Sequence, residues 1–113
     1  MTTPEKRVKD KVKAMLKEKG AYFFMPATAG FGKSGVPDIV ACLDGRFYGI
    51  ECKAQPNKPT ALQEKNLEQI AQTKGVAIAV DETGLGALKM LLDSGIVYAA
   101  KSDVIRLLKG DDK

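Results

Sequence analysis

Residues 35–53 read GVPDIVACLDGRFYGIECK, and this stretch decides the fold. It contains two apolar, partly β-branched runs at 39–43 and 46–50, joined by Asp44 and Gly45. An Asp-Gly pair between two such runs is typical of a two-residue β-hairpin, because both turn residues must accept a positive φ. The stretch therefore predicts one antiparallel hairpin.

The register of this hairpin brings charged side chains together. With a two-residue turn, Leu43 lies opposite Arg46. Asp38 then faces Glu51, and Lys53 points to the same side of the sheet. Like charges directly opposed across two strands destabilise the pair, so the facing carboxylates need a partner. A divalent cation between them converts repulsion into ligation, and hard oxygen ligands suit Mg²⁺.

The alternative assigns these residues no chemistry. Asp38 would then cap the strand after Pro37, and the other two would be an ion pair facing solvent. A slip of one residue in the hairpin would also send the two carboxylates to opposite faces of the sheet. The convergence of three charged groups in one register favours a site.

The same residues carry a family signature. Pro-Asp at 37–38, followed by Glu-Cys-Lys at 51–53, has the form P-D…E-x-K and resembles the PD-(D/E)xK nuclease superfamily. With Glu5 on a leading helix and Gln63 at the start of a later one, the chain is similar to the VRR-NUC family over roughly residues 4–80. P-D alone is a weak signal, whereas P-D with E-x-K on a hairpin is more specific.

This resemblance implies a fold, a reaction and a set of residues. The implied fold is α/β, a restriction-endonuclease-like core of order αβββαβ with a central mixed sheet flanked by helices, here with extra C-terminal helices. The implied reaction is hydrolysis of DNA phosphodiester bonds with Mg²⁺ or Mn²⁺. The catalytic residues would be Asp38, Glu51, Lys53 and Gln63. The metal ligands would be Glu5, Asp38, Glu51 and the backbone carbonyl of Cys52.

The resemblance also implies a substrate. Family members of this size resemble phage Holliday-junction resolvases, which act as dimers, so branched DNA and a homodimer with two symmetric sites are expected. Nicking, flap or restriction-like endonucleases are the alternatives among enzymes. A non-catalytic DNA-binding module is the alternative of another class, although the intact Asp38, Glu51 and Lys53 argue against it.

Length and composition set outer limits. The 113 residues predict one domain, 1–113, with a modest core. The absence of a membrane-length apolar run and of a signal-peptide pattern favours a cytoplasmic protein of a bacterial or phage-infected cell. The chain has no histidine, which excludes His-based nucleases, His-ligated zinc and Ser-His-Asp chemistry. The net charge of +4 permits DNA as a partner; no membrane and no small-molecule substrate are expected.

The two cysteines, Cys42 and Cys52, both fall inside strand runs and do not form a CxxC pair. In the predicted register Cys42 faces Phe47 rather than the other cysteine. Buried, reduced thiols are therefore expected.

A helix is predicted from Thr3, as its N-cap, to Gly20, with Pro4 at the first helical position. Its apolar stripe consists of Val8, Val12, Met15 and Leu16. Glu5 lies at the end of that stripe, so its carboxylate is expected to point toward the sheet; the alternative is a glutamate that only complements the helix dipole. The candidate DNA contacts on this helix are Lys6, Lys9 and Lys13.

The glycine-rich segment 27–34, ATAGFGKS, matches a phosphate-binding loop loosely. Such a loop requires a helix directly after it, and Pro37 forces extended backbone there instead, so NTP binding is disfavoured. The segment is either a plain connection or a loop facing DNA. In the second case Lys33 would contact phosphate and Phe31 a sugar or base.

A second helix is predicted from Thr60 to about residue 74, followed by a strand at 76–80 that is buried on both faces and parallel to the Glu51 strand. Gln63 fits a capping box with Thr60, yet it also shares the inward stripe of Leu67. Both roles for Gln63 stay open.

Three elements are predicted beyond residue 80. Residues 83–93 form a helix and 96–99 a short edge strand. Ser102 and Asp103 cap a last helix that holds Val104, Ile105, Leu107 and Leu108. Most of this aliphatic surface is expected to pack in the core, and part of it could serve a dimer.

Overall fold

The structure is a computed structural model that describes residues 2–27, 32–95 and 103–109. In these residues five strands form one sheet in the spatial order β1-β2-β3-β4-β5. The strands are β1 Tyr22–Phe24, β2 Ile39–Leu43, β3 Arg46–Cys52, β4 Val76–Val80 and β5 Ile105–Leu107. The helices are α1 Pro4–Glu18, α2 Ala61–Gln72 and α3 Leu85–Ser94, with a 3₁₀ turn η1 at Glu82–Gly84. This arrangement confirms the predicted α/β core with a mixed sheet.

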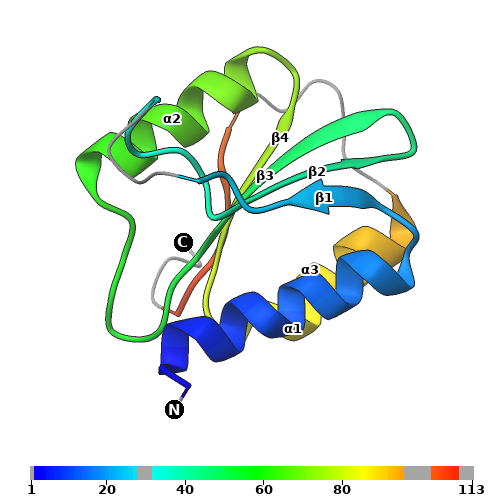
Figure 1. The fold of residues 1–113 in the computed structure, drawn as a ribbon, viewed down its shortest axis with the longest axis horizontal. Coiled ribbons are helices and arrows are strands. Elements are labelled where there is room, and N and C mark those ends of the chain that lie inside the picture. Colours follow the sequence, from blue (N-terminus) through cyan, green and yellow to red (C-terminus); the bar gives the residue numbers. More distant parts are fainter. Residues whose placement is uncertain (1, 28–31, 96–102, 110–113) are drawn as a thin grey trace.

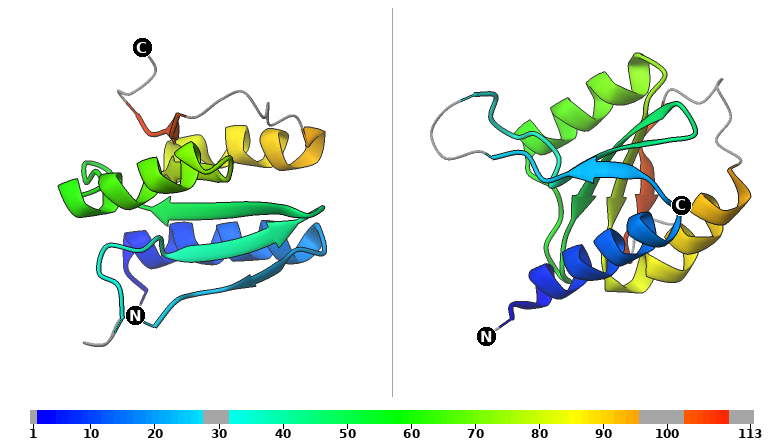
Figure 2. Two further views of the ribbon diagram at one scale, coloured as in Figure 1. Left: turned by 90° about the horizontal axis from the view of Figure 1, so that it is seen from above. Right: turned by 45° about the vertical axis from the view of Figure 1, so that its right-hand side comes forward.

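Helices cover both faces of the sheet. α2 lies on one face, and α1 and α3 lie together on the other (Figures 1 and 2). The larger core lies under α1 and α3 and includes Leu16 and Ile50, whereas the smaller core lies under α2 and includes Leu67 and Ala79. Successive residues of a strand pack into opposite cores, because side chains alternate between the two faces of a sheet.

The hairpin has the register that the sequence predicts. Leu43 pairs with Arg46, and Ile39 pairs with Ile50. The turn between them is Asp44 and Gly45, with φ of 53° and 77°. Because both residues accept a positive φ, the two strands reverse within two residues and no side chain changes face.

Strand β4 runs parallel to β3, with Ile50 opposite Ile78 and Glu51 opposite Ala79. All five residues of β4 are buried. Both observations confirm the predicted crossover through α2, since a central strand covered on both faces is apolar throughout.

The helix ends follow local sequence signals. The Thr3 side chain caps α1 by accepting a hydrogen bond from the backbone N–H of Lys6 at 3.1 Å. Gly20 ends that region with a φ of 76°. Thr60 caps α2 as predicted. In the described part of the chain, no helix is long and apolar enough to cross a membrane.

No helix starts within residues 32–38, which lead directly into β2. This confirms the prediction that the glycine-rich segment lacks the helix that a phosphate-binding loop requires.

The prediction of a last helix holding residues 104–108 is wrong. Residues Ile105–Leu107 form β5, which pairs parallel to β4 with Ile105 opposite Ile78. The aliphatic spacing fits a helix or a strand, and the free edge of β4 offers backbone partners only to a strand. The Arg106 guanidinium of β5 also reaches the Glu64 carboxylate of α2 at 2.7 Å. The predicted edge strand at 96–99 lies outside the described residues.

The cysteine prediction is half wrong. Cys52 is buried, and burial raises the pKa of its thiol, but Cys42 is exposed. Cys42 pairs with Phe47 on one side and Tyr22 on the other, and all three side chains are exposed. Helix α2 packs on β3 and β4, so this face of β1 and β2 has no cover from it.

Candidate active site

Asp38 and Glu51 lie at the open end of the hairpin, opposite the turn. Asp38 immediately precedes β2, and its Oδ2 accepts a hydrogen bond from the backbone N–H of Cys52 at 2.9 Å. Ile39 pairs with Ile50 one position inside. The structure therefore brings the two predicted carboxylates together on facing strands.

Glu51 is a buried acid without a hydrogen-bond donor. Only 1% of its surface is exposed, and within the described part of the chain neither carboxylate oxygen has a hydrogen-bond partner. Burial and then the negative charge of Asp38 raise the pKa of Glu51 to about 8, and the positive charge of Lys53 offsets this only in part. Burying an ionised carboxylate without a donor costs folding free energy unless a positive charge lies nearby.

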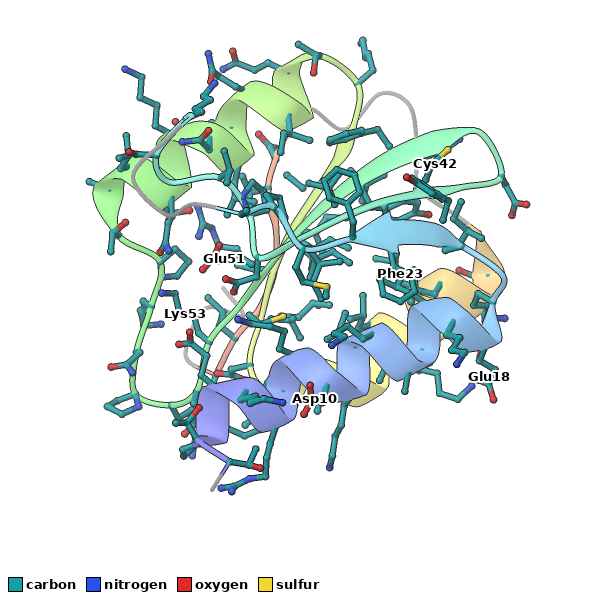
Figure 3. All side chains as sticks on the ribbon, viewed as in Figure 1. Asp10, Glu18, Phe23, Cys42, Glu51 and Lys53 are labelled. Carbon is teal, nitrogen blue, oxygen red and sulfur yellow. The ribbon has the colours of Figure 1, made fainter. Side chains whose placement is uncertain are left out.

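Lys53 supplies part of that compensation. Its backbone N–H donates to the Val80 carbonyl at 2.9 Å, so the extended backbone of β3 continues past Cys52. Its side chain therefore points to the same side as that of Glu51, and Nζ lies 3.6 Å from Glu51 Oε2. Figure 3 shows Glu51 and Lys53 near each other, far from Cys42 at the other end of the sheet.

A second lysine reaches the site from α1. Lys9 Nζ lies 3.8 Å from Asp38 Oδ1. From the sequence, Lys9 is predicted only as one of the general DNA contacts. Its spacing of four residues from Glu5, which puts both on one helix face, was the available signal.

A cleft of about 320 Å³ opens beside Asp38. It is lined by Lys9, Met25, Pro26, Ser34, Gly35, Val36, Pro37, Asp38 and Gln63. Its walls come from α1, the end of β1, the segment before β2 and the first turn of α2. The cleft gives a ligand access to Asp38, whereas Glu51 is buried and does not line the cleft.

Gln63 caps α2 and also lies beside the cleft, and its role in the site stays a prediction. Its Oε1 accepts a hydrogen bond from the Thr60 backbone N–H at 2.9 Å, and its own backbone N–H donates to Thr60 Oγ1 at 3.2 Å, which completes a capping box. The same side chain lines the cleft. The cap uses the amide oxygen, so the amide nitrogen is the group that can act in the cleft.

Glu5 is half-buried and contributes charge to the site from α1. Its negative charge is among the smaller causes that raise the pKa of Glu51. Among the described residues, no three Asp, Glu or Cys side chains are placed to hold one metal ion. Glu5 as a metal ligand, directly or through water, stays a prediction.

The chemistry of the site fits a divalent cation. A buried carboxylate without a donor faces a second carboxylate, and both offer hard oxygen ligands. The backbone carbonyl of Cys52, between Glu51 and Lys53, is the further ligand that the sequence resemblance implies. Asp38, Glu51 and this carbonyl are the groups that would hold Mg²⁺ or Mn²⁺.

The predicted DNA contacts lie on two elements. On α1, Lys6 and Lys13 both pair with Asp10, at 3.0 Å and 3.8 Å. Lys33 is exposed and donates to Gln69 Oε1 of α2 at 3.1 Å. Phe31 lies outside the described residues.

Comparison with known proteins identifies the family. A family model described as archaeal Holliday junction resolvase (Hjc) matches residues 6–84. The chain belongs to this family. The matched part of the chain contains Asp38, Glu51, Lys53 and Gln63, and it begins one residue after Glu5.

Among solved structures, this chain is similar to one described as a VRR_NUC domain, with a TM-score of 0.66 and 21% sequence identity. The similarity covers 81% of this chain and 97% of the other. It shows that the two share a fold. No curated protein sequence matches.

Proposed function

We propose that the protein is a divalent-metal-dependent endonuclease that hydrolyses phosphodiester bonds in branched DNA and acts as a homodimer. The observation that carries this proposal is the buried, donor-free carboxylate of Glu51, with Asp38 on the facing strand and Lys53 Nζ at 3.6 Å. Burying Glu51 without a hydrogen-bond donor costs free energy that a purely structural role would not require.

The two carboxylates and the Cys52 carbonyl would hold the cation, with Glu5 assisting through water. A bound cation supplies Lewis-acid stabilisation of negative charge. Lys53 positions or activates the attacking water and stabilises the charge that develops on the phosphate. Gln63 orients water or phosphate through its amide nitrogen, because its oxygen serves the helix cap.

The choice of branched DNA rests on family membership, and the surface around the cleft supports it. Lys9 lines the cleft, and Lys6 and Lys13 lie on the same helix. Lys33 belongs to the segment between β1 and β2 and is the chain neighbour of Ser34, which lines the cleft. Phe31 is kept as a proposed contact from the sequence alone. In a homodimer, a two-fold axis relates two such sites, which suits symmetric cleavage of a four-way junction.

The test is cleavage of a panel of DNA structures with and without Mg²⁺. Four-way junctions should be cut much faster than linear duplexes, flaps and nicked duplexes, and only with the metal. Lys53→Ala should abolish cleavage while leaving junction binding largely intact. Faster cleavage of flaps, nicked duplexes or linear duplexes than of four-way junctions would favour a flap, nicking or restriction-like enzyme.

A calorimetric titration with Mn²⁺ separates the enzyme from a non-catalytic DNA-binding module. The endonuclease requires Mn²⁺ binding that Asp38→Asn removes. Binding of DNA without carboxylate-dependent binding of the metal would support the module.

A further inference from the structure

Each carboxylate of the site faces a lysine from a different layer of the molecule. Lys53, on the strand of Glu51, lies 3.6 Å from Glu51 Oε2. Lys9, on α1, lies 3.8 Å from Asp38 Oδ1. These two ammonium groups lie close enough to offset the negative charges of the two carboxylates. A divalent cation at the carboxylates would meet two positive charges of the protein, so its entry favours the departure of one of them.

The two lysines differ in their freedom to leave. The Lys53 side chain is 11% exposed, whereas that of Lys9 is 32% exposed. Lys9 also lines the cleft of about 320 Å³, which gives its ammonium group a place to go. Lys53 has no such outlet, since it does not line that cleft.

The oxygens of Asp38 differ in the same way. Oδ2 is held by the backbone N–H of Cys52 at 2.9 Å. Oδ1 faces Lys9 at a distance too long for a hydrogen bond. The oxygen that is available to a cation is therefore the one that Lys9 neutralises.

We infer that Lys9 is an exchangeable counter-ion of the site. It neutralises Asp38 Oδ1 in the metal-free protein, yields this oxygen to the divalent cation, and turns into the cleft, where its ammonium group contacts a phosphate of the DNA. Lys9 thus acts on metal affinity and on substrate binding in opposite directions. This role rests on the proposed function and assigns to one residue of α1 a task that general DNA binding does not include.

Lys13 provides a matched control. It lies one turn further along α1, its side chain is 34% exposed, and its Nζ is 3.8 Å from Asp10 Oδ1. Residue type, exposure and ion-pair distance therefore match those of Lys9. The difference is the site, because Lys13 does not line the cleft and Asp10 is not one of its carboxylates.

The first experiment is a calorimetric titration with Mn²⁺ alone, without DNA. Lys9→Met should bind Mn²⁺ about fivefold more tightly than the wild type, because the cation no longer competes with an ammonium group. Lys13→Met should bind it like the wild type. Lys9→Arg keeps the charge and should restore the weaker affinity.

The second experiment measures binding of a four-way junction in Mg²⁺, with all variants in a Lys53→Ala background. Lys9→Met should bind DNA about fivefold more weakly and lower the salt dependence by about one phosphate contact. Lys9→Arg should bind like the parent. Opposite changes in the two affinities are the signature, since a merely structural role would weaken both.

Unchanged or weaker Mn²⁺ binding by Lys9→Met would overturn the inference. If the wild type binds Mn²⁺ and Asp38→Asn does not, the proposed function survives that result and only the role of Lys9 falls. If the wild type binds no Mn²⁺, both fall. Tighter Mn²⁺ binding with unchanged DNA binding would overturn the phosphate contact.

Discussion

Glu51 lies near the end of β3, and Asp81 directly follows the neighbouring strand β4. The two acids are almost equally buried, with 1% and 2% of their surfaces exposed. Asp81 accepts hydrogen bonds from the backbone N–H groups of Thr83 at 2.8 Å and Lys109 at 3.1 Å, and from the Thr83 hydroxyl. Glu51 has no donor among the described residues.

The pKa values of the two acids move in opposite directions. Burial acts to raise the pKa of Asp81, but the hydrogen bonds from Thr83 and Lys109 outweigh it and the pKa is lowered. At Glu51, burial and the charge of Asp38 act together and raise the pKa to about 8. Burial alone thus does not set the direction of the pKa shift; the supply of hydrogen-bond donors decides it.

The backbone after each strand explains the difference. After β4 the chain turns into η1, and this turn directs N–H groups at the Asp81 side chain, which caps it. After β3 the chain stays extended, with the Lys53 N–H bonded to Val80 of the next strand. The donors near Glu51 are therefore used in the sheet, and its carboxylate remains available to a ligand.

The largest expected effect is on catalysis. Glu51→Gln should slow cleavage of a four-way junction at least about a hundredfold, because it removes a ligand charge from the site. In EDTA, the free energy of unfolding should stay about equal near neutral pH and rise above a pH of about 8, where the amide replaces a buried charge without donors. Single-turnover cleavage rates and urea denaturation measure the two quantities.

Glu68→Gln is the control for this variant, since it changes an exposed acid on α2. It should leave both quantities unchanged. A Glu51→Gln protein that cleaves at nearly the wild-type rate would remove Glu51 from the site.

The converse variant acts on stability. Asp81→Asn should lower the free energy of unfolding by about 2 kcal/mol, because an amide cannot accept all of the hydrogen bonds that the carboxylate accepts. Cleavage should be unchanged at temperatures where the variant is folded. Wild-type stability of Asp81→Asn would show that the hydrogen bonds at Asp81 do not hold η1 and β5 in place.

The two acids should also give opposite dependences of stability on pH, measured as the melting temperature in EDTA. The pKa of Glu51 is raised from 4.5 to about 8, so its contribution is present below pH 4.5 and is lost as the pH rises through about 8. The pKa of Asp81 is lowered from 3.8, so its contribution is present above pH 3.8 and is lost as the pH falls through the folded-state pKa.

Each neutral variant should remove one of the two declines in melting temperature with pH. Glu51→Gln should abolish the decline toward alkaline pH, and Asp81→Asn should reduce the decline in acid. A wild-type profile without a decline between pH 4.5 and about 8 would contradict the unpaired state of Glu51.

The smallest effects concern Gln63, which takes part in a structural helix cap and also lines the cleft of the candidate site. Thr60→Ala removes the cap and should lower the free energy of unfolding by about 1 kcal/mol, with little effect on cleavage. Gln63→Glu keeps the capping box but places a carboxylate in the cleft, and should slow cleavage about tenfold at unchanged stability. Cleavage at the wild-type rate by Gln63→Glu would leave Gln63 with the cap alone.

The candidate site was predictable where its geometry is local. The facing positions of Asp38 and Glu51 follow from a two-residue turn and the alternation of a strand, and the observed register agrees. The capping box of Gln63 is visible in the sequence for the same reason. The approach of Lys9 to Asp38 was not predictable, since it depends on how α1 lies across the sheet.

The C-terminal region shows the same limit for the fold. The spacing of the aliphatic residues in 104–108 satisfies a helix and a strand equally. The structure selects β5 because the edge of β4 is free and because Gly84 has no side chain to collide with Leu107. Both conditions are set by residues more than twenty positions away.

The amino-acid sequence by itself determined the hairpin, its register and hence the opposition of two acids, because a tight turn and a two-residue period act between neighbours in the chain. Only the tertiary structure decided that Glu51 is buried with no donor from the described residues, that Lys9 faces Asp38, and that Ile105–Leu107 is a strand. These outcomes depend on which strand edges and hydrogen-bond donors are left without partners after the helices pack on the sheet. That packing involves segments far apart in the chain.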